Sequence, residues 1–194
     1  MKIFNMLHEK ENPFANETPL WMIMPDSAIV RSGNPFFVPD FDDKFEAFPA
    51  LAVRLDRLGK SVAPRFAYRY YNEMTAAVTV RASGLLRKLR DAAMPWDRAV
   101  IFDKSCFLGN YINSEEFFSA KTIDFRIGEH QLSFPLEEKK ESIDTTISAI
   151  SRENIIKMGD ILLIPLTSEG FELHPQMDLS ALINENNLLD IRIK

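Results

Sequence analysis

Ala47-Phe-Pro-Ala-Leu-Ala-Val-Arg-Leu-Asp-Arg-Leu58 is the stretch that decides the fold. Its second half alternates apolar and polar residues, which is the two-residue period of a strand with one buried face: Leu51, Val53 and Leu55 against Arg54. The following Gly59 is a residue that ends regular structure. The stretch therefore predicts a long strand in a β-sheet.

Working outward, apolar and β-branched runs predict further strands, and the spacing of turn residues predicts two hairpins. Single strands are expected over residues 2–7, 20–24, 75–82 and 161–165, with an extended piece over 35–39. The hairpins are expected over 122–127 with 131–136, and over 179–183 with 188–193 around Asn186-Asn187. Residues 8–19 and 40–46 are polar or acidic and are expected to form loops.

Helices are expected to be few and short. Pro64 can open one that runs to about Met74, Ser83 can cap one that runs to about Ala92, and apolar residues at helical spacing indicate a third over 142–151. With more strand than helix, the prediction is an α+β, mostly β protein with a closed or folded-over mixed sheet, a roll or barrel. A length of 194 residues suits a single domain. Residues 1–18 are expected to add an N-terminal strand and loop to a main part over 19–194.

Composition excludes several classes of function. Apolar residues make up 46% and charged residues 26% of the chain, the balance of a globular protein with a core. A net charge of −5 without a basic patch argues against nucleic acid as a partner, and Arg81 to Arg90 fits the wet face of an amphipathic helix. No run approaches the ~18 apolar residues of a membrane span, so no membrane partner is expected. The absence of a targeting segment predicts a cytoplasmic protein.

Five segments, taken in order, resemble the fumarylacetoacetate hydrolase (FAH) family of hydrolases, isomerases and decarboxylases that act on acylpyruvates and related keto acids. They are Pro19-Leu-Trp-Met-Ile-Met-Pro-Asp-Ser-Ala28, Val53-Arg-Leu-Asp-Arg-Leu-Gly-Lys60, Trp96 with Phe102-Asp103, Lys157-Met-Gly-Asp-Ile-Leu162, and Leu189-Asp-Ile-Arg-Ile193. The resemblance implies the mixed β-roll of the family's C-terminal domain, a homodimer, and Mg²⁺ or Ca²⁺ as the family's usual cofactor.

The family's metal site is formed by a Glu-x-Glu pair on one strand and an Asp on its neighbour. Residues i and i+2 of a strand face the same way, so two Glu converge on one hard cation, which polarises the keto-acid substrate. By the resemblance, these three positions are Phe48, Ala50 and Thr79. A two-residue slip would bring in Glu46 but pair it with Phe48, and a one-residue slip would find no second acid. The resemblance therefore implies that the metal is lost.

Other positions of the family's chemistry are also replaced. Its two lysines fall on Met24 and Val100, its Arg-Asp pair on Ser83-Gly84, and its late anion-holding turn on Ile164-Pro-Leu-Thr-Ser168. Arg81, Val100 and Asp103 are the expected neighbours of the altered pocket. The departures lie on the chemistry while the scaffold segments persist, and apolar replacements remove the need to satisfy buried charge.

His8-x-x-Glu11 resembles the family's catalytic dyad, in which a carboxylate orients an imidazole that activates water. The pattern also fits an exposed loop without function. Cys106, the only cysteine, excludes an internal disulfide and fits an inert buried thiol; His130 and His174 fit exposed turns. No two histidines have the spacing of metal ligands.

Three functions are consistent with these residues. The first is a pseudoenzyme of the family, without metal-dependent catalysis, that binds, regulates or serves as a scaffold. The second is a hydrolase or isomerase acting on an acylpyruvate or related keto acid with relocated residues, among them His8, Glu11, Arg81 and Asp103. The third is a binder of a small apolar or carboxylate ligand at the altered pocket. A pocket closed by Phe48 would count against the second function.

Overall fold

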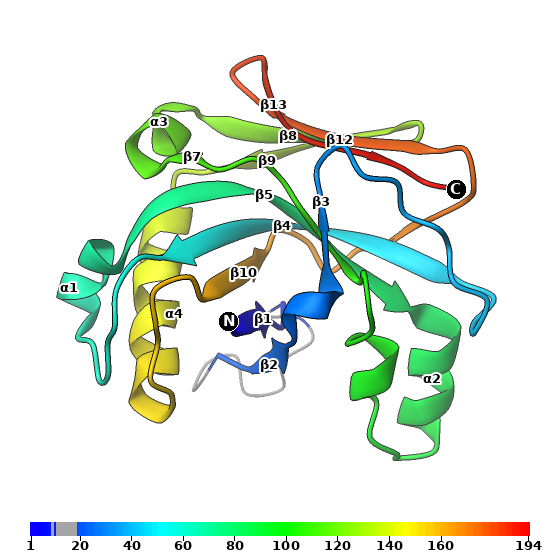
Figure 1. Cartoon of the computed structure of the whole chain (residues 1–194), viewed down its shortest axis with the longest axis horizontal. Helices are drawn as coiled ribbons and strands as arrows, with labels where there is room; N and C mark the ends of the chain where they lie inside the picture. The colour runs from blue at the N-terminus through cyan, green and yellow to red at the C-terminus, as the bar shows by residue number, and fades with distance from the viewer. Residues whose placement is uncertain (9, 11–18) are drawn as a thin grey trace.

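The computed structural model describes residues 1–8, 10 and 19–194 and shows two β-sheets with a few helices at their ends (Figure 1). In this described part, the larger sheet has the strand order β2-β1-β10-β4-β5-β6-β3, and β11 and β7 add short pairings to β4 and β5. These strands are β1 (Ile3–Met6), β2 (Trp21–Met24), β3 (Ile29–Arg31), β4 (Phe45–Leu55), β5 (Tyr71–Ala82), β6 (Cys106–Leu108), β7 (Ile112–Asn113), β10 (Ile161–Pro165) and β11 (Phe171–Glu172). Parallel and antiparallel pairs both occur in it.

The smaller sheet is antiparallel, in the order β13-β12-β8-β9: β8 (Thr122–Ile127), β9 (His130–Pro135), β12 (Asp178–Ile183) and β13 (Asn186–Arg192). The α-helices are α1 (Pro64–Ala67), α2 (Ser83–Asp91), α3 (Ser114–Ser119) and α4 (Lys139–Glu153), with 3₁₀ turns at Asp26–Ala28, Tyr68–Tyr70 and Asp97–Ala99. The predicted α+β, mostly β class with a curled mixed sheet is confirmed.

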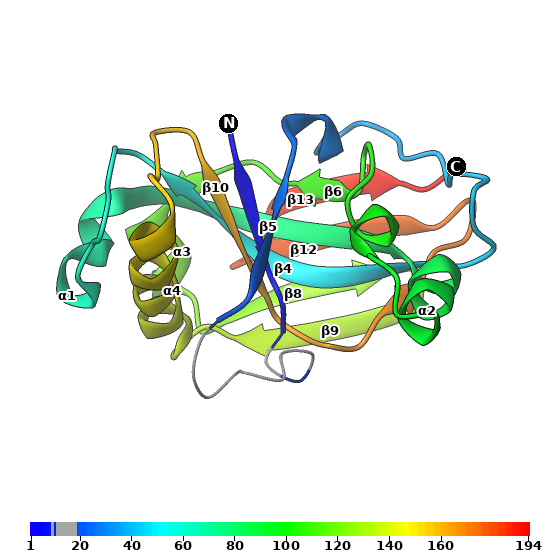
Figure 2. The same cartoon turned by 90° about the horizontal axis from the view of Figure 1, so that it is seen from below.

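Strands β4 and β5 are neighbours in the middle part of the larger sheet. They pair antiparallel from Phe45 opposite Ala82 to Leu55 opposite Tyr71. One face of this pair packs against the smaller sheet and α4 in the main core, which includes Leu51, Val53 and Val78. The other face is concave, and β1 and β2 lie beneath it (Figures 1 and 2). Small residues such as Ala50, Ala52 and Ala77 occur on the concave face, where a curled sheet leaves less room for side chains.

Three local predictions are wrong. The helix expected over 64–74 ends at Ala67, and β5 begins at Tyr71, whose pairing with Leu55 and burial outweigh its helical neighbours. The turn of the second hairpin lies at Asn184-Glu185, both with positive φ, instead of at 186–187. The piece expected over 35–39 contributes a single bridge, Phe36 to Ile193.

The start of α2 was also predicted wrongly. Ser83 does not cap the helix, because its hydroxyl donates to the carboxylate of Glu46 on β4. The cap comes from a distant loop: Asp42 Oδ2 accepts the backbone N–H of Leu85 at 2.9 Å. Gly84 leaves the room for this, because a Cβ there would lie 2.5 Å from Asp42 Oδ1. No described helix has both the length and the apolar character of a membrane span.

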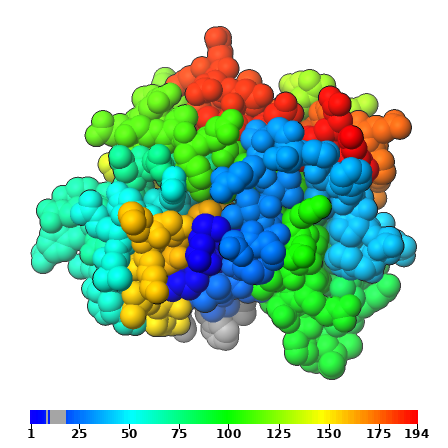
Figure 3. Space-filling model, in the orientation of Figure 1, coloured from blue at the N-terminus to red at the C-terminus, as the bar shows by residue number. Residues whose placement is uncertain are grey.

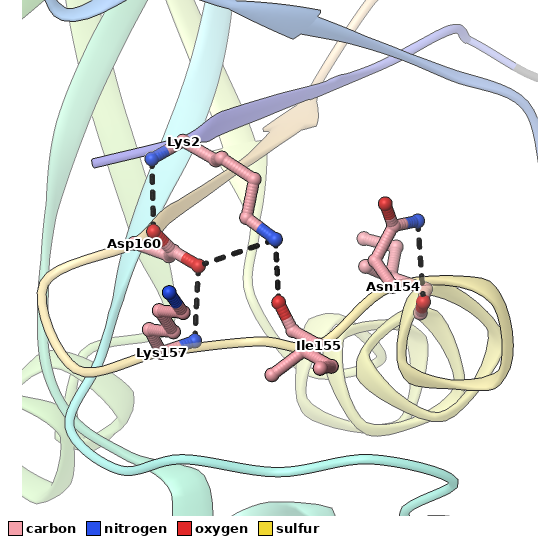
Figure 4. Close-up of polar contacts among 6 residues, drawn as sticks. Lys2, Asn154, Ile155, Lys157 and Asp160 are labelled. Carbon is pink, nitrogen blue, oxygen red and sulfur yellow. Dashed lines mark hydrogen bonds and ion pairs between the residues drawn. The ribbon is translucent and has the colours of Figure 1, made fainter.

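Asp160 joins the N-terminus to the turn before β10 (Figure 4). Its buried carboxylate accepts the backbone N–H of Lys2 at 2.8 Å and that of Lys157 at 2.9 Å. The ammonium of Lys2 lies 3.9 Å from the same carboxylate and also donates to the carbonyl of Ile155. One buried charge thus fixes β1 and residues 155–160 to each other.

We expect Asp160→Ala to lower the free energy of unfolding by roughly 2 kcal/mol, because it leaves two partly buried N–H groups without their charged acceptor. Urea denaturation measures the change. Asp178→Ala is the matched control, because the Asp178 side chain is 71% exposed and its ion pair with Arg192 spans 3.6 Å. An equal loss in both variants would contradict this role for Asp160.

Candidate functional site

The structure brings Phe48, Ala50 and Thr79 together on the concave face of the larger sheet. Phe48 lies directly opposite Thr79 across the β4–β5 pairing, and Ala50 is two residues along β4 on the same face. All three are buried, with exposed fractions of 6%, 2% and 5%. The geometry is that of a converging strand triad, but two of its members carry no polar side-chain atom.

The ring of Phe48 is enclosed by its neighbours. The guanidinium carbon of Arg81, the next residue on that face of β5, lies 4.0 Å from the ring centroid, a close cation–π contact. Gly170 approaches so closely that a Cβ there would lie 2.6 Å from Phe48 Cζ. The position that would carry the first carboxylate of the triad is therefore filled by an aromatic ring.

Met24 and Val100, where the resemblance places two lysines, are also buried in apolar surroundings. Met24 is fully buried in the same cluster as Ala50, Ala77 and Cys106. Val100 packs with Leu86, Ala99 and the neighbouring Met22. The concave floor thus continues as apolar surface from β4 across β2 to the segment before β6.

Glu46 is the carboxylate of β4 that lies nearest to this floor along the strand. Burial alone would raise the pKa of Glu46, but hydrogen bonds from Lys44 and Ser83 outweigh it, assisted by the charges of Lys44 and Arg81. The net effect lowers the pKa of Glu46 below its ordinary value of 4.5. Lys44 Nζ lies 2.8 Å from Glu46 Oε1. This carboxylate therefore already interacts with cations of the protein itself.

These residues do not fit a catalytic divalent cation. Mg²⁺ and Ca²⁺ take oxygen ligands, mainly carboxylates, whereas Phe48 and Ala50 offer none and Thr79 offers one hydroxyl. Across residues 1–8, 10 and 19–194, no group of three or more His, Cys, Asp or Glu side chains has the arrangement of a metal site.

His8 lies elsewhere, in the wall of a cavity of about 780 Å³ at the end of β1. Its Nδ1 accepts the backbone N–H of Lys10 at 3.2 Å. The other walls come from the start of α4 and the end of β10: Glu137, Glu138, Glu141, Ser142, Ile164 and Pro165. Glu11, its expected partner, lies outside the described residues. The cavity was not predicted from the sequence, because three distant segments form it.

The remaining candidates are dispersed. Arg81 and Val100 are buried, whereas Asp103 is exposed and accepts a 2.7 Å hydrogen bond from Ser27. None of the three lines either of the two main cavities that the described residues form. Burial raises the pKa of the Cys106 thiol to about 12, so it stays protonated and unreactive. His130 and His174 are exposed, as expected.

Comparison with known proteins connects this arrangement to a family. The sequence profile described as "Fumarylacetoacetate (FAA) hydrolase C-terminal" matches residues 3–183. Oxaloacetate tautomerase YcgM of Escherichia coli (strain K12) is 22% identical over 151 residues, which cover 76% of this chain and 69% of that protein.

Solved structures share the fold. Fumarylpyruvate hydrolase from Pseudomonas aeruginosa matches over 100% of this chain and 89% of its own, with a TM-score of 0.85 and 15% identity. The 5-carboxymethyl-2-hydroxymuconate delta-isomerase from Mycobacterium smegmatis matches over 99% and 78%, with a TM-score of 0.77 and 19% identity. These likenesses agree with the β-roll that the resemblance implied.

We expect Glu46→Gln to destabilise the protein by about 1 kcal/mol near pH 7, because it removes a partly buried charge from the Lys44 and Arg81 cations. The folded-state pKa lies below 4.5, so this stabilisation is complete above that pH and disappears as the pH falls through the folded value.

Thermal unfolding of both proteins between about pH 7 and pH 3 measures the effect. The difference in Tm between wild type and Glu46→Gln should shrink at the acid end. Glu73→Gln is the control, because the Glu73–Arg54 pair is about half exposed and should contribute little at any pH. A Tm difference independent of pH would show that the charge of Glu46 is not what stabilises the fold.

Proposed function

We propose a function for this chain from the premise that it belongs to the fumarylacetoacetate hydrolase family. The proposal is that the chain keeps the family's fold without its metal-dependent catalysis and acts by binding, as a regulatory or scaffold protein. The observation that supports it most strongly is the closed, apolar floor at Phe48, Ala50 and Thr79.

The physical reason lies in what a divalent cation requires. A bound Mg²⁺ or Mn²⁺ would have to replace most of its water by protein and substrate oxygens. At this place it would meet the ring of Phe48 and the positive guanidinium of Arg81, 4.0 Å from each other. The fixed guanidinium repels a second cation, and the ring fills the space without offering an oxygen ligand, so no step of a metal-assisted reaction can be assigned to these residues.

The relatives define the activities that must be tested. One solved relative is a fumarylpyruvate hydrolase in complex with Mn²⁺ and pyruvate, and another relative is an oxaloacetate tautomerase. The corresponding alternative for this chain is a hydrolase or isomerase acting on an acylpyruvate or related keto acid with relocated residues. The cavity beside His8 favours this alternative, because an imidazole in a cavity wall can exchange protons with a bound molecule.

The proposal also covers the oligomeric state, the cellular location and the class of ligand. The family resemblance supports a homodimer, and the composition supports a cytoplasmic protein. The ligand expected from the sequence is a small apolar or carboxylate molecule; in the cavity beside His8, the three glutamates of the wall favour the apolar class.

Isothermal titration tests the loss of the metal. We expect Mn²⁺ or Mg²⁺, added in the presence of oxalate or pyruvate, to give no heat beyond dilution, because no carboxylate set exists to hold the ion. The P. aeruginosa hydrolase, solved with Mn²⁺ and pyruvate, is the positive control. Saturable binding with a Kd below about 1 mM would contradict the proposal.

Absorbance assays of oxaloacetate tautomerisation and fumarylpyruvate hydrolysis separate the two functions. We expect no rate above buffer, with or without Mn²⁺. Turnover that resists a chelator and is abolished in His8→Ala would establish the alternative instead. His130→Ala is the matched control, because His130 is an exposed histidine on β9, outside the cavity.

A further inference from the structure

The segment that follows β4 and the segment that precedes β10 pair as a short antiparallel ribbon. Gly59 and Ile156 exchange two backbone hydrogen bonds of 3.0 Å, and both residues are buried. Antiparallel pairing therefore places Leu58 opposite Lys157, and Lys60 opposite Ile155. Because side chains alternate between the faces of a ribbon, these four point outward.

Two of the apolar side chains here are the most exposed large hydrophobic residues of the described chain. Met158 is 77% exposed and Leu58 is 70% exposed, and Ile155 adds a third at 50%. We define the 58/158 face as Arg57, Leu58, Lys60, Ile155, Lys157 and Met158. Its two segments lie side by side in the lower left of Figure 1, and Figure 3 shows them as adjoining cyan and amber surface.

Residues 56–60 and 152–158, which include the face, carry four cations and the two carboxylates Asp56 and Glu153, so this end is locally basic although the chain carries a net charge of −5. Of the three cations of the face, only Arg57 lies within ion-pair distance of a carboxylate among the described residues, at 3.2 Å from Asp56. The adjoining α1 continues the pattern, because Arg65 and Arg69 both lie over the ring of Phe66, at 4.8 and 5.0 Å. Apolar side chains and cations are therefore interleaved at this end of the molecule.

Contacts from the protein interior hold the face in shape. The Lys2 ammonium donates to the carbonyl of Ile155, and Asp160 anchors the backbone of Lys157 (Figure 4). Lys60 Nζ donates to the carbonyl of Arg152 at 3.0 Å. A Cβ at Gly59 would lie 2.5 Å from the Tyr70 ring, so glycine allows this close packing. These contacts therefore hold in place the backbone that carries the exposed side chains.

We propose that the 58/158 face docks on an anionic lipid bilayer. Leu58, Ile155 and Met158 enter the headgroup layer, and the three cations of the face contact lipid phosphate and carboxylate groups. The side chains of this face are exposed, and none of its residues lines the cavity beside His8 or the one beside Phe37. The expectation of no membrane partner rested on the lack of a spanning run, which surface docking does not need.

A second copy of the chain fits this face less well. In a two-fold symmetric contact the same patch meets itself, so the basic residues of the two copies would face each other. The docking proposal is independent of whether the fold retains catalytic activity, because the face shares no residue with the cavity or with the triad positions.

Co-sedimentation of the full chain with vesicles tests the proposal, using phosphatidylcholine alone or mixed with phosphatidylserine. We expect binding to the serine-containing vesicles only, weakened by high salt. Arg57→Gln with Lys157→Gln should weaken it roughly 25-fold, since each cation near such a surface contributes about fivefold. Leu58→Ala with Met158→Ala should weaken it about tenfold or more, because less apolar area is buried.

Matched variants elsewhere on the surface control for charge and apolar area. Phe37→Ala with Met94→Ala removes side chains that are 57% and 55% exposed, and Lys104→Gln with Arg126→Gln removes two exposed cations. Neither pair should change binding, and all variants should unfold at the wild-type temperature. No binding to serine-containing vesicles, or binding that the Leu58 and Met158 changes leave intact, would overturn the proposal. So would self-association that depends on these two residues without vesicle binding.

Discussion

The pairing of β4 with β5 is the constraint on which the rest of the structure depends. It runs from Phe45 opposite Ala82 to Leu55 opposite Tyr71, and the larger sheet is built outward from it. Side chains alternate along both strands, so this register decides which residues enter the main core and which face the concave side. A slip by one residue would exchange the two sets and expose the core.

On the concave side, buried Phe48 and Ala50 occupy positions where the family resemblance places two carboxylates. A carboxylate buried there without its cation would cost several kcal/mol, so replacing only part of an acidic site leaves the remainder unstable. In this chain Met24, Ala50 and Phe48 are apolar parts of the floor, Thr79 adds one hydroxyl, and Arg81 is held over the Phe48 ring. Glu46, the carboxylate of β4, is paired with Lys44. Apolar packing stabilises such a floor, whereas a metal site holds like charges together at a cost in stability.

The same strand also positions the surface at the far end of the molecule. The register between β4 and β10 continues past the sheet to the pair Gly59 and Ile156. Beyond the sheet, the side chains that alternate outward have no layer to cover them, so Leu58 and its neighbours are exposed. The buried carboxylate of Asp160 then fixes residues 155–160 against β1. Strand β4 therefore contributes residues to the buried floor and leads directly into the exposed 58/158 face.

The sequence by itself determined the class of fold, because alternation and apolar runs are local patterns that survive without knowledge of partners. The strand through Leu51 and Leu55, both hairpins and the helix over 142–151 follow from them. It also predicts, through the family resemblance, that Phe48, Ala50 and Thr79 occupy the metal positions, and the structure places these three residues together. Only the tertiary structure decided that β5 begins at Tyr71 and that Asp42 caps α2. It also decided that His8 borders a cavity lined by the ends of β1 and β10 and the start of α4. It alone brought Leu58 beside residues 155–158. The physical reason is that pairing and burial act between segments that are not neighbours in the sequence, and their energies exceed the local preferences that a sequence displays.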